Sequence, residues 1–171
     1  MDFGKVMFSP NGRIGQQDYW IGVLIIIGGN IIGGFIPILG FFISLVLIWC
    51  GIAVYGKRLH DAGKSAWLHV IPWALGILLG VIGFVMILGA GLGAAMSADG
   101  GELEPDQILA LIAGGGTGIL VMSSSFLVWI IYTIWVGVMK GEPEANAHGP
   151  VPGSEPTPAP AASAGEGPDQ G

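Results

Sequence analysis

Long stretches without a charged residue dominate the chain, and the first two cover residues 19–56, with 38 residues, and residues 65–98, with 34. A helix needs about 20 apolar residues to cross the hydrocarbon core of a bilayer. The first stretch is therefore long enough for two crossings. A turn signal at Pro37-Ile38-Leu39-Gly40 divides it into predicted helices at 19–36 and 38–55.

The second stretch predicts a third helix over residues 66–88, and the Gly/Ala-rich residues 89–98 either extend it or fray. An acidic loop follows, made of Asp99, Glu102, Glu104 and Asp106. Pro105 suits the first turn of a short helix that reaches Ala113, and the three glycines at 114–116 are expected to interrupt it. The fourth long helix is expected over residues 117–138.

The two ends of the chain differ in character from the middle. Apolar residues near the start favour a short surface helix over residues 3–7. Residues 141–171 are rich in Pro, Ala, Gly, Ser and Glu, and such a segment buries too little apolar surface to offset the entropy of ordering it. We predict an all-α membrane protein: a cytoplasmic segment at 1–18, four transmembrane helices in two hairpins at 19–140, and a disordered tail at 141–171.

Composition agrees with this class. Of the 171 residues 52% are hydrophobic and 11% are charged, whereas about 25% charged is usual for a soluble domain. The net charge of −6 argues against a nucleic-acid partner, which needs a clustered basic surface. Cys50 is the only cysteine and lies in an apolar run, so we expect a small buried hydrophobe rather than a reactive thiol.

The positions of the Lys and Arg residues predict how the chain is oriented in the membrane. With four crossings all six Lys and Arg residues fall on one side of the membrane: Lys5, Arg13, Lys57, Arg58, Lys64 and Lys140. The positive-inside rule then places both termini in the cytoplasm. All six Trp and all three Tyr lie in the half of their helix nearest that side, as expected for headgroup-level aromatics. A three-crossing alternative would leave the acidic loop in hydrocarbon.

The densest chemical cluster is Lys57-Arg58-Leu59-His60-Asp61. We predict a basic inner face that contacts lipid headgroups or another membrane protein, formed by Arg13, Lys57, Arg58, His60, Asp61 and Trp67. Arg13 either contacts lipid phosphate or pairs with Asp61. The weaker alternative is that His60 and Asp61 form an acid–base pair or bind a metal ion. Metal sites usually have three or four ligands, and no second His or Cys group lies at a suitable spacing. No catalytic, cofactor or metal residue is predicted.

Two further features have alternative interpretations. His69 lies near the inner end of its helix and is expected to reach for lipid headgroups. Small-xxx-small spacings occur at Gly29/Gly33, Gly76/Gly80, Gly89/Gly93 and Gly114/Gly118. They favour close helix packing inside one chain, with dimerisation as the alternative.

Three motifs resemble a known family. They are Phe8-Ser9-Pro10-Asn11-Gly12-Arg13 with Asp18-Tyr19-Trp20, then Lys57 through Trp67, and finally Gly141 through Asn146 with Gly149, Pro150 and Pro152. Together they resemble the small bacterial inner-membrane proteins known as domain of unknown function family 805. Lys57 stands where the family usually has Arg, and Ala66 where it has Gly; residues 89–116 and the tail beyond Pro152 look like additions. Lysine lacks the guanidinium fork, which weakens bidentate phosphate binding at position 57.

The resemblance implies a multi-helix protein of the bacterial cytoplasmic membrane and implies no activity. We therefore expect a non-enzymatic module that interacts with membrane lipids, with a membrane-protein partner or with its own copies. The alternative is a small transporter or channel formed by oligomerisation. The absence of ionisable groups near the middle of the predicted spans argues against that alternative.

Overall fold

The computed structural model describes residues 2–98 and 101–154, and the regular elements within them are helical apart from one isolated bridge between Asn146 and Gly149. The elements are α1 (Phe3–Phe8), α2 (Gln16–Gly34), α3 (Pro37–Asp61), the short 3-10 helix η1 (Ala66–His69), α4 (Val70–Ser97) and α5 (Pro105–Val138). The predicted all-α class is confirmed.

Local signals in the sequence set several helix ends. Pro37 and Pro105 are the first residues of α3 and α5, where a missing backbone N–H costs no helical hydrogen bond. Glu104 and Gln107 form a capping box, in which the Glu104 amide donates to Gln107 Oε1 at 2.9 Å. Ser65 caps η1 with its hydroxyl. The first backbone donors of these helices are therefore capped, as in η1 and α5, or replaced by proline, as at Pro37 and Pro105.

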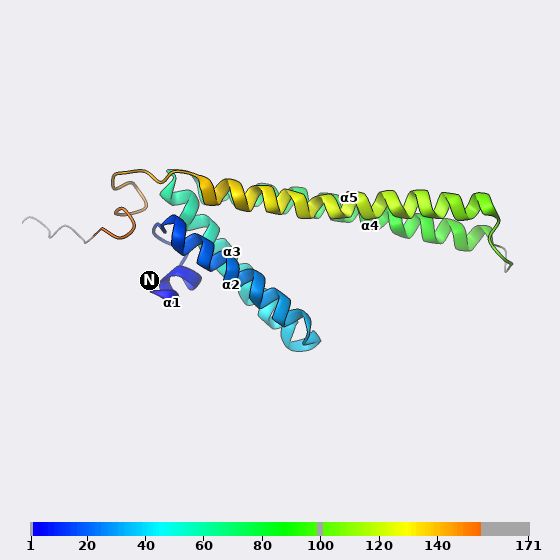
Figure 1. The fold of residues 1–171 in the computed structure, drawn as a ribbon, viewed down its shortest axis with the longest axis horizontal. Helices are drawn as coiled ribbons and strands as arrows, with labels where there is room; N and C mark the ends of the chain where they lie inside the picture. The colour runs from blue at the N-terminus through cyan, green and yellow to red at the C-terminus, as the bar shows by residue number, and fades with distance from the viewer. Residues whose placement is uncertain (1, 99–100, 155–171) are drawn as a thin grey trace, which may run out of the picture.

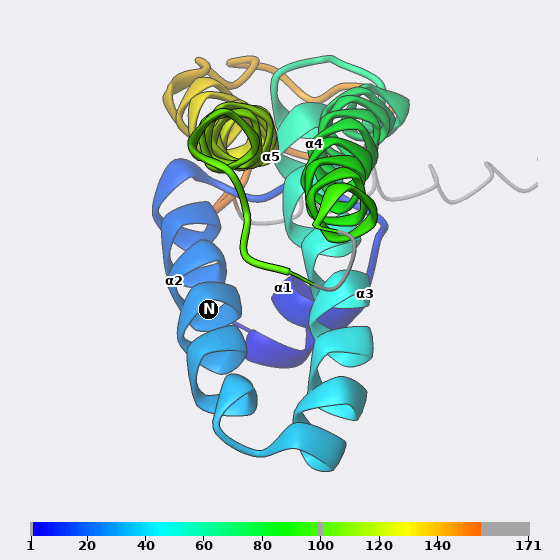
Figure 2. The same cartoon turned by 90° about the vertical axis from the view of Figure 1, so that its right-hand side faces the viewer.

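The helices form two antiparallel hairpins that diverge from a shared base (Figures 1 and 2). α2 pairs with α3, and α4 pairs with the still longer α5. No Cα of α3 lies within 8 Å of a Cα of α4 among the described residues, whereas α5 touches both α2 and α3 near the base. The two predicted hairpins are present, but they are joined only at one end.

That end carries the cations. We call it the basic end and define it as residues 2–15, 57–65 and 139–154, which include all six Lys and Arg. The N-terminal segment and the chain after α5 both lie there (Figure 1). The buried core lies in and beside it, and its largest fully buried side chains are Tyr19, Met7, Leu59, Val54, Val136 and Cys50. The prediction that Cys50 is buried is confirmed.

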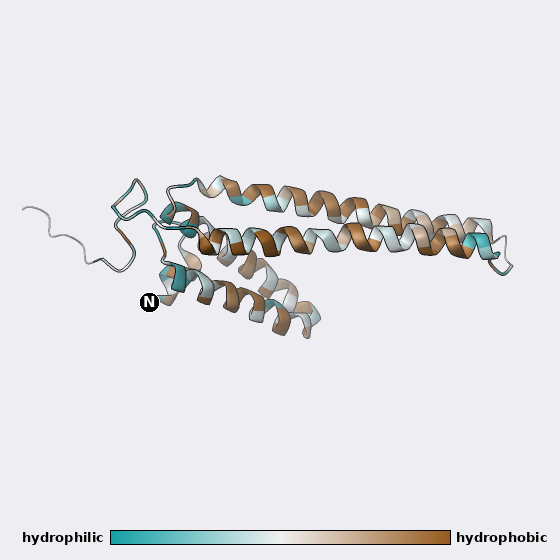
Figure 3. Ribbon diagram, turned by 45° about the horizontal axis from the view of Figure 1, so that its top comes forward, coloured by the Kyte–Doolittle hydropathy of each residue, from teal (hydrophilic) through white to brown (hydrophobic). Residues whose placement is uncertain are grey.

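Away from the basic end the helices are rich in apolar residues (Figure 3), and many of their large side chains are exposed. Phe35 and Ile38 at the tip of the α2–α3 hairpin are 83% and 81% exposed, and Leu120 in the middle of α5 is 72% exposed. Long apolar helices with outward-facing side chains suit a lipid environment, because lipid rather than a protein core removes these side chains from water.

Three helical stretches are long and apolar enough to cross a bilayer: Pro37–Asp61, Ala66–Ser97 and Pro105–Val138. The structure thus supports three of the four predicted spans. α2 falls short because its first turn carries Gln16, Gln17 and Asp18. Asn30 adds a further polar group within α2, although its side chain donates to Ile26 O at 2.9 Å inside the helix.

The predicted interruption at residues 114–116 is wrong. α5 continues through these glycines, and α4 extends through residues 89–97. Glycine costs about 1 kcal/mol in a helix in water. In an apolar setting a broken backbone hydrogen bond costs several kcal/mol, so the helix persists. At about 1.5 Å per residue the 34 residues of α5 reach about 51 Å, more than the ~30 Å hydrocarbon core.

Glycines allow close approach within each hairpin. Gly33 of α2 lies against the backbone of Gly40 in α3, and Gly83 of α4 lies against that of Gly118 in α5. A Cβ on Gly118 would lie 2.7 Å from Gly83 O, whereas one on Gly89 or Gly93 would meet nothing within 4 Å. Packing inside the chain, the first of the two interpretations, is therefore confirmed for the glycines whose added Cβ would meet the other helix of the hairpin within 3.4 Å, which are Gly29, Gly33, Gly76, Gly114 and Gly118. It is absent at Gly80, Gly89 and Gly93.

We predict that Gly118→Ala lowers the melting temperature of the detergent-purified protein. The added methyl group must displace the α4 backbone, and such overpacking costs about 1–3 kcal/mol. Gly116→Ala is the matched control, since a Cβ at Gly116 meets nothing within 4 Å. Equal melting temperatures for the two variants would show that α4 and α5 do not approach as closely as the structure places them.

Candidate functional site at the basic end

Asp61 is the central residue of the basic end. Its carboxylate lies between two guanidinium groups, with Arg13 Nη2 at 2.9 Å and Arg58 Nη1 at 2.5 Å. All three side chains are almost fully buried, at 5%, 1% and 3% exposure respectively. Of the two predicted roles for Arg13, pairing with Asp61 is the one that the structure contains.

The two cations exceed what one carboxylate neutralises, and backbone carbonyls supply further acceptors. Arg58 Nη2 donates to Met139 O and, at 3.5 Å, to Gly137 O. These carbonyls lie at the C-terminus of α5, where the helix dipole favours a positive charge. Arg58 Nε is buried without a hydrogen-bond partner in the described part of the chain. Arg58 therefore ties the end of α3 to the end of α5.

Arg13 holds the segment that follows α5. Its guanidinium donates to Glu142 O and Glu144 O, both at 2.7 Å, and to Gly149 O at 3.4 Å. Asn146 Nδ2 donates to His60 O at 2.9 Å. The segment is thereby fixed to the C-terminal turn of α3 and to the residues that precede α2.

This arrangement differs from the expectation of a tail that is disordered from residue 141. Residues 141–154 are ordered against the basic end, and Glu142 N donates to Asp61 O at 2.8 Å. Composition predicts disorder because the segment has little apolar surface to bury, but a buried guanidinium and exposed helix carbonyls can order it through hydrogen bonds. Residues 155–171 of the predicted tail lie outside the described residues.

Gly141 allows the chain to pass Asp61. A Cβ at Gly141 would lie 2.9 Å from the carboxyl carbon of Asp61. Gly63, in the turn after α3, has a φ of +65° that favours glycine, and a Cβ there would meet the carboxylate of Glu142. Both glycines are thus required by close contact between the α3–η1 turn and residues 141–142.

Lys57 is buried, with 2% of its surface exposed. Its Nζ donates to Lys5 O at 2.5 Å and to Val6 O at 2.7 Å. These carbonyls belong to the last turn of α1, where they have no partner within the helix. Lys57 therefore docks α1 onto α3, and its ammonium group is used inside the protein.

His60 and Trp67 are the remaining predicted contact residues. The His60 ring stacks on His148 with 3.7 Å between ring centroids, and its Nδ1 lies 3.3 Å from Gly12 O. Since a carbonyl only accepts, Nδ1 is the protonated nitrogen of His60. Trp67 is 81% exposed. Of the six predicted residues, four are thus buried in internal contacts, one is partly buried and Trp67 faces outward.

A second cluster, of aromatic side chains, joins the two hairpins beside the basic end. Tyr19 Oη donates to Thr133 O and Tyr55 Oη pairs with Thr133 Oγ1, both at 2.8 Å. Tyr55 also stacks on Tyr132, with ring centroids 5.6 Å apart. The cluster links α2 and α3 to α5. Sequence reasoning missed it because tyrosines near a membrane surface usually indicate interfacial placement.

His69 belongs to this cluster, and the expectation that it reaches for headgroups is wrong. It is 6% exposed. Trp73 Nε1 donates to His69 Nε2 at 3.2 Å, and His69 Nδ1 lies 3.1 Å from Tyr132 Oη. An indole N–H only donates, so Nε2 is unprotonated and His69 is the neutral Nδ1–H form. The spacing of four residues between His69 and Trp73 on one helix face is the signal that sequence reasoning overlooked.

The side chains with acid, base or ligand chemistry are largely engaged. Asp61 pairs with two arginines, and His60 is held by a carbonyl and a second ring. Among residues 2–98 and 101–154 no three His, Cys, Asp or Glu side chains come together as a metal site would require. The arrangement is that of a structural junction.

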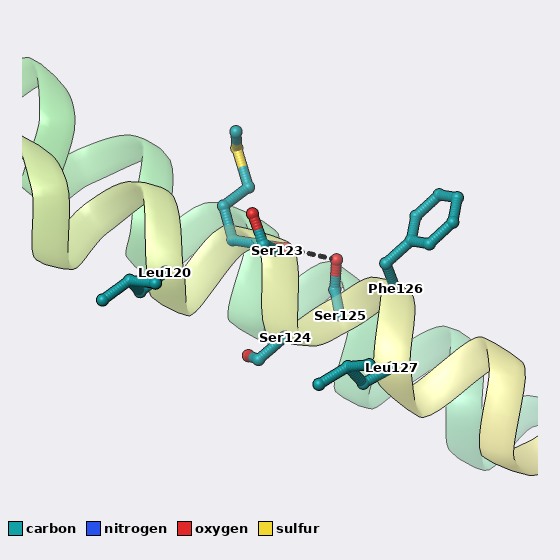
Figure 4. Close-up of a pocket in the computed structure, with 7 residues that line it drawn as sticks. Leu120, Ser123, Ser124, Ser125, Phe126 and Leu127 are labelled. Carbon is teal, nitrogen blue, oxygen red and sulfur yellow. Dashed lines mark hydrogen bonds between the residues drawn. The ribbon is translucent and has the colours of Figure 1, made fainter.

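A shallow hollow on α5 lies away from these clusters (Figure 4). It is lined by Leu120, Met122, Ser123, Ser124, Ser125, Phe126 and Leu127. Ser124 and Ser125 donate to the carbonyls of Val121 and Met122 in their own helix, at 2.5 and 2.6 Å. Their hydroxyls are thus satisfied within the helix, as serines in apolar helices require.

One protein family matches most of this chain. The family described as "Protein of unknown function (DUF805)" matches residues 7–150. The chain belongs to this family. The matched range contains all three segments that meet at Asp61, including the residues that Arg13 holds.

Curated relatives add no activity. An Escherichia coli K12 protein titled "Uncharacterized protein YiiR" is 37% identical over 88 residues, which cover 44% of this chain and 58% of the relative. The same protein from strain O157:H7 matches equally. The chain thus spans 58% of the length of the curated relatives it matches. No solved structure matches the chain.

We predict that Asp61→Asn sharply reduces the yield of folded protein and lowers its melting temperature. Removing one partner of a buried ion pair typically costs about 3–5 kcal/mol, because the remaining charge stays buried without compensation. Here two arginines lose their carboxylate. Folded yield in detergent by size-exclusion chromatography, followed by thermal unfolding, measures the effect.

Glu144→Gln is the matched control for this substitution. It removes one carboxylate at the same end but keeps the backbone carbonyl to which Arg13 donates. A melting temperature for Asp61→Asn equal to that of Glu144→Gln would contradict the central place of Asp61.

Proposed function

We propose that the protein is a non-enzymatic, multi-pass module of the bacterial cytoplasmic membrane that interacts with membrane lipids or with another membrane protein through its basic end. In this proposal both termini lie in the cytoplasm, and α2 crosses the membrane in addition to α3, α4 and α5. The observation that carries this proposal is that all six Lys and Arg residues lie in the basic end, where the two hairpins meet. The positive-inside rule assigns that end to the cytoplasm.

Three features of α2 support its role as a crossing. It pairs antiparallel with α3, a helix that is long and apolar enough to span. Its 19 residues reach about 28 Å, close to the ~30 Å of the hydrocarbon core. Its middle exposes Leu24, Ile27 and Ile31 by 50% or more, which favours lipid around it.

The non-enzymatic part of the proposal is supported by how the polar groups are used. The carboxylate of Asp61 and the ring of His60 are held by neighbouring groups. An interaction module needs groups that face outward instead. Trp67, Lys64 and Lys140 meet that need at the basic end.

The alternative, a small channel or transporter built from several copies, is favoured by the open glycines of α4. Gly89 and Gly93 would allow close approach of a second copy, since no atom lies within 4 Å of a Cβ built at either. Ion or solute flux through vesicles that contain the purified protein, lost in Gly93→Leu, would favour this alternative over the interaction module.

The topology has a direct test. In a Cys50→Ser background, a membrane-impermeant maleimide applied to intact spheroplasts should label Glu102→Cys and spare Asn11→Cys and Lys64→Cys. The latter two should react only after permeabilisation. If α2 does not cross, Asn11→Cys will be labelled from outside while Lys64→Cys stays protected, which would leave three crossings.

We also predict that native mass spectrometry of protein released with its surrounding membrane detects a bound lipid or protein that Trp67→Ala loses. Trp67 is the most outward-facing of the predicted contact residues. Trp135→Ala, which removes a 43% exposed Trp near the end of α5, is the control and should retain the bound species. Wild-type protein that carries neither a lipid class nor a protein above the control would overturn the interaction module.

A further inference from the structure

An apolar crevice of about 510 Å³ lies where α3, η1 and α4 separate. Its walls include Ile48 and Ile52 of α3, Trp67 of η1, and Val70 and Trp73 of α4. It exists because η1 turns the chain away from α3, and α3 and α4 make no contact further along among the residues described.

Water is a poor occupant of this crevice. A bound water needs two to four polar partners. His69 is the one titratable side chain in the lining, and both its ring nitrogens are already occupied, by Tyr132 and by Trp73. The occupant that the walls favour is therefore apolar.

The volume of the crevice decides between an acyl chain and a protein helix. A helix about 10 Å across fills roughly 420 Å³ with each 5.4 Å turn. The crevice accordingly holds little more than one turn of a partner helix, so most of such a helix would lie outside it. A lipid chain is narrower and can enter such a space from the surrounding bilayer.

A lysine close in sequence to the crevice lining indicates the headgroup. Arg13 and Arg58 pair with Asp61, and Lys57 donates to backbone carbonyls. Lys64, by contrast, is exposed and forms no ion pair within the described ranges. It stands two residues before Ala66, where the crevice wall begins. An ammonium group at this position suits a phosphate, and an outward indole at position 67 suits the headgroup level.

We propose that this crevice binds one anionic phospholipid of the cytoplasmic leaflet, with an acyl chain between α3 and α4 and the headgroup phosphate at Lys64. The inference rests on the proposed orientation of the basic end and names a lipid class and a site for the proposed interaction. It also moves the phosphate contact away from Lys57 and Arg58, whose donors are used inside the protein.

The test is lipid retention by purified, delipidated protein in mixed micelles of phosphatidylglycerol and phosphatidylcholine, read by native mass spectrometry. We expect one phosphatidylglycerol per chain, retained about five-fold over phosphatidylcholine, the ratio expected for one favourable lysine contact. Lys64→Gln should abolish this preference. Lys140→Gln removes the other exposed lysine of the basic end that forms no ion pair with the described residues, and it should leave the preference unchanged.

The acyl-chain position is tested separately. Ile52→Trp places a large ring in the crevice and should abolish retention of phosphatidylglycerol. Ile38→Trp, at an 81% exposed position at the far end of α3, should not. If Ile52→Trp fails to fold, quenching of the Trp67 signal by phosphatidylglycerol brominated on its acyl chain decides the same point, with Trp67→Phe as the reference.

Three outcomes would overturn this proposal. They are equal retention of the two lipids by wild type, equal losses for Lys64→Gln and Lys140→Gln, and a dimer that occupies the crevice in place of lipid. None of these outcomes contradicts the proposed function, provided that maleimide labelling confirms the orientation and that Trp67→Ala still loses a bound protein. Asn11→Cys labelled from outside would instead overturn the orientation itself.

Discussion

A single buried carboxylate holds the basic end together. Asp61 ends α3, Arg13 precedes α2, and Arg58 reaches from α3 to the carbonyls that end α5. Removing three charges from water is costly, and it becomes favourable only when each charge has several partners. The carbonyls around Arg13 and Arg58 supply those partners, which explains why residues 141–154 are held in place.

This junction is important because the hairpins share so little else. Each is internally close-packed, with glycine against backbone at Gly33/Gly40 and at Gly83/Gly118. Between them, contact is confined to the basic end and to the aromatic cluster around Thr133. The rest of each hairpin presents apolar side chains outward, where lipid is a suitable neighbour. The crevice beside η1 follows from the same divergence.

The cations have two different uses. Arg13, Lys57 and Arg58 bind groups inside the protein. They still contribute to the positive-inside rule, because a helix inserts into the membrane before the final packing forms. Lys5, Lys64 and Lys140 remain at the surface, so fewer cations are available to a partner than the six in the sequence suggest. Three lysines and the indole of Trp67 are outward-facing groups of this end, and the ammonium group of Lys5 lies beside the carboxylate of Asp2.

The amino-acid sequence by itself determined the class of the protein, the paired helices and the concentration of cations at one end. These properties depend on local composition, on runs of apolar residues and on signals such as Pro37 and Pro105. It also allowed the pairing of Arg13 with Asp61 to be predicted, as one of two alternatives for Arg13. The break expected at residues 114–116 failed because glycine propensities measured in water do not apply to an apolar helix.

Only the tertiary structure decided which polar groups are buried. Lys57 and Arg58 have the composition of a lipid-binding motif, and His69 that of an interfacial side chain, but each meets partners that are distant in sequence. The folding of residues 141–154 has the same origin, because a segment with so little apolar surface becomes ordered when buried donors such as Arg13 meet its carbonyls. Such contacts between distant segments leave no periodic pattern in the chain, and the fold alone brings them together.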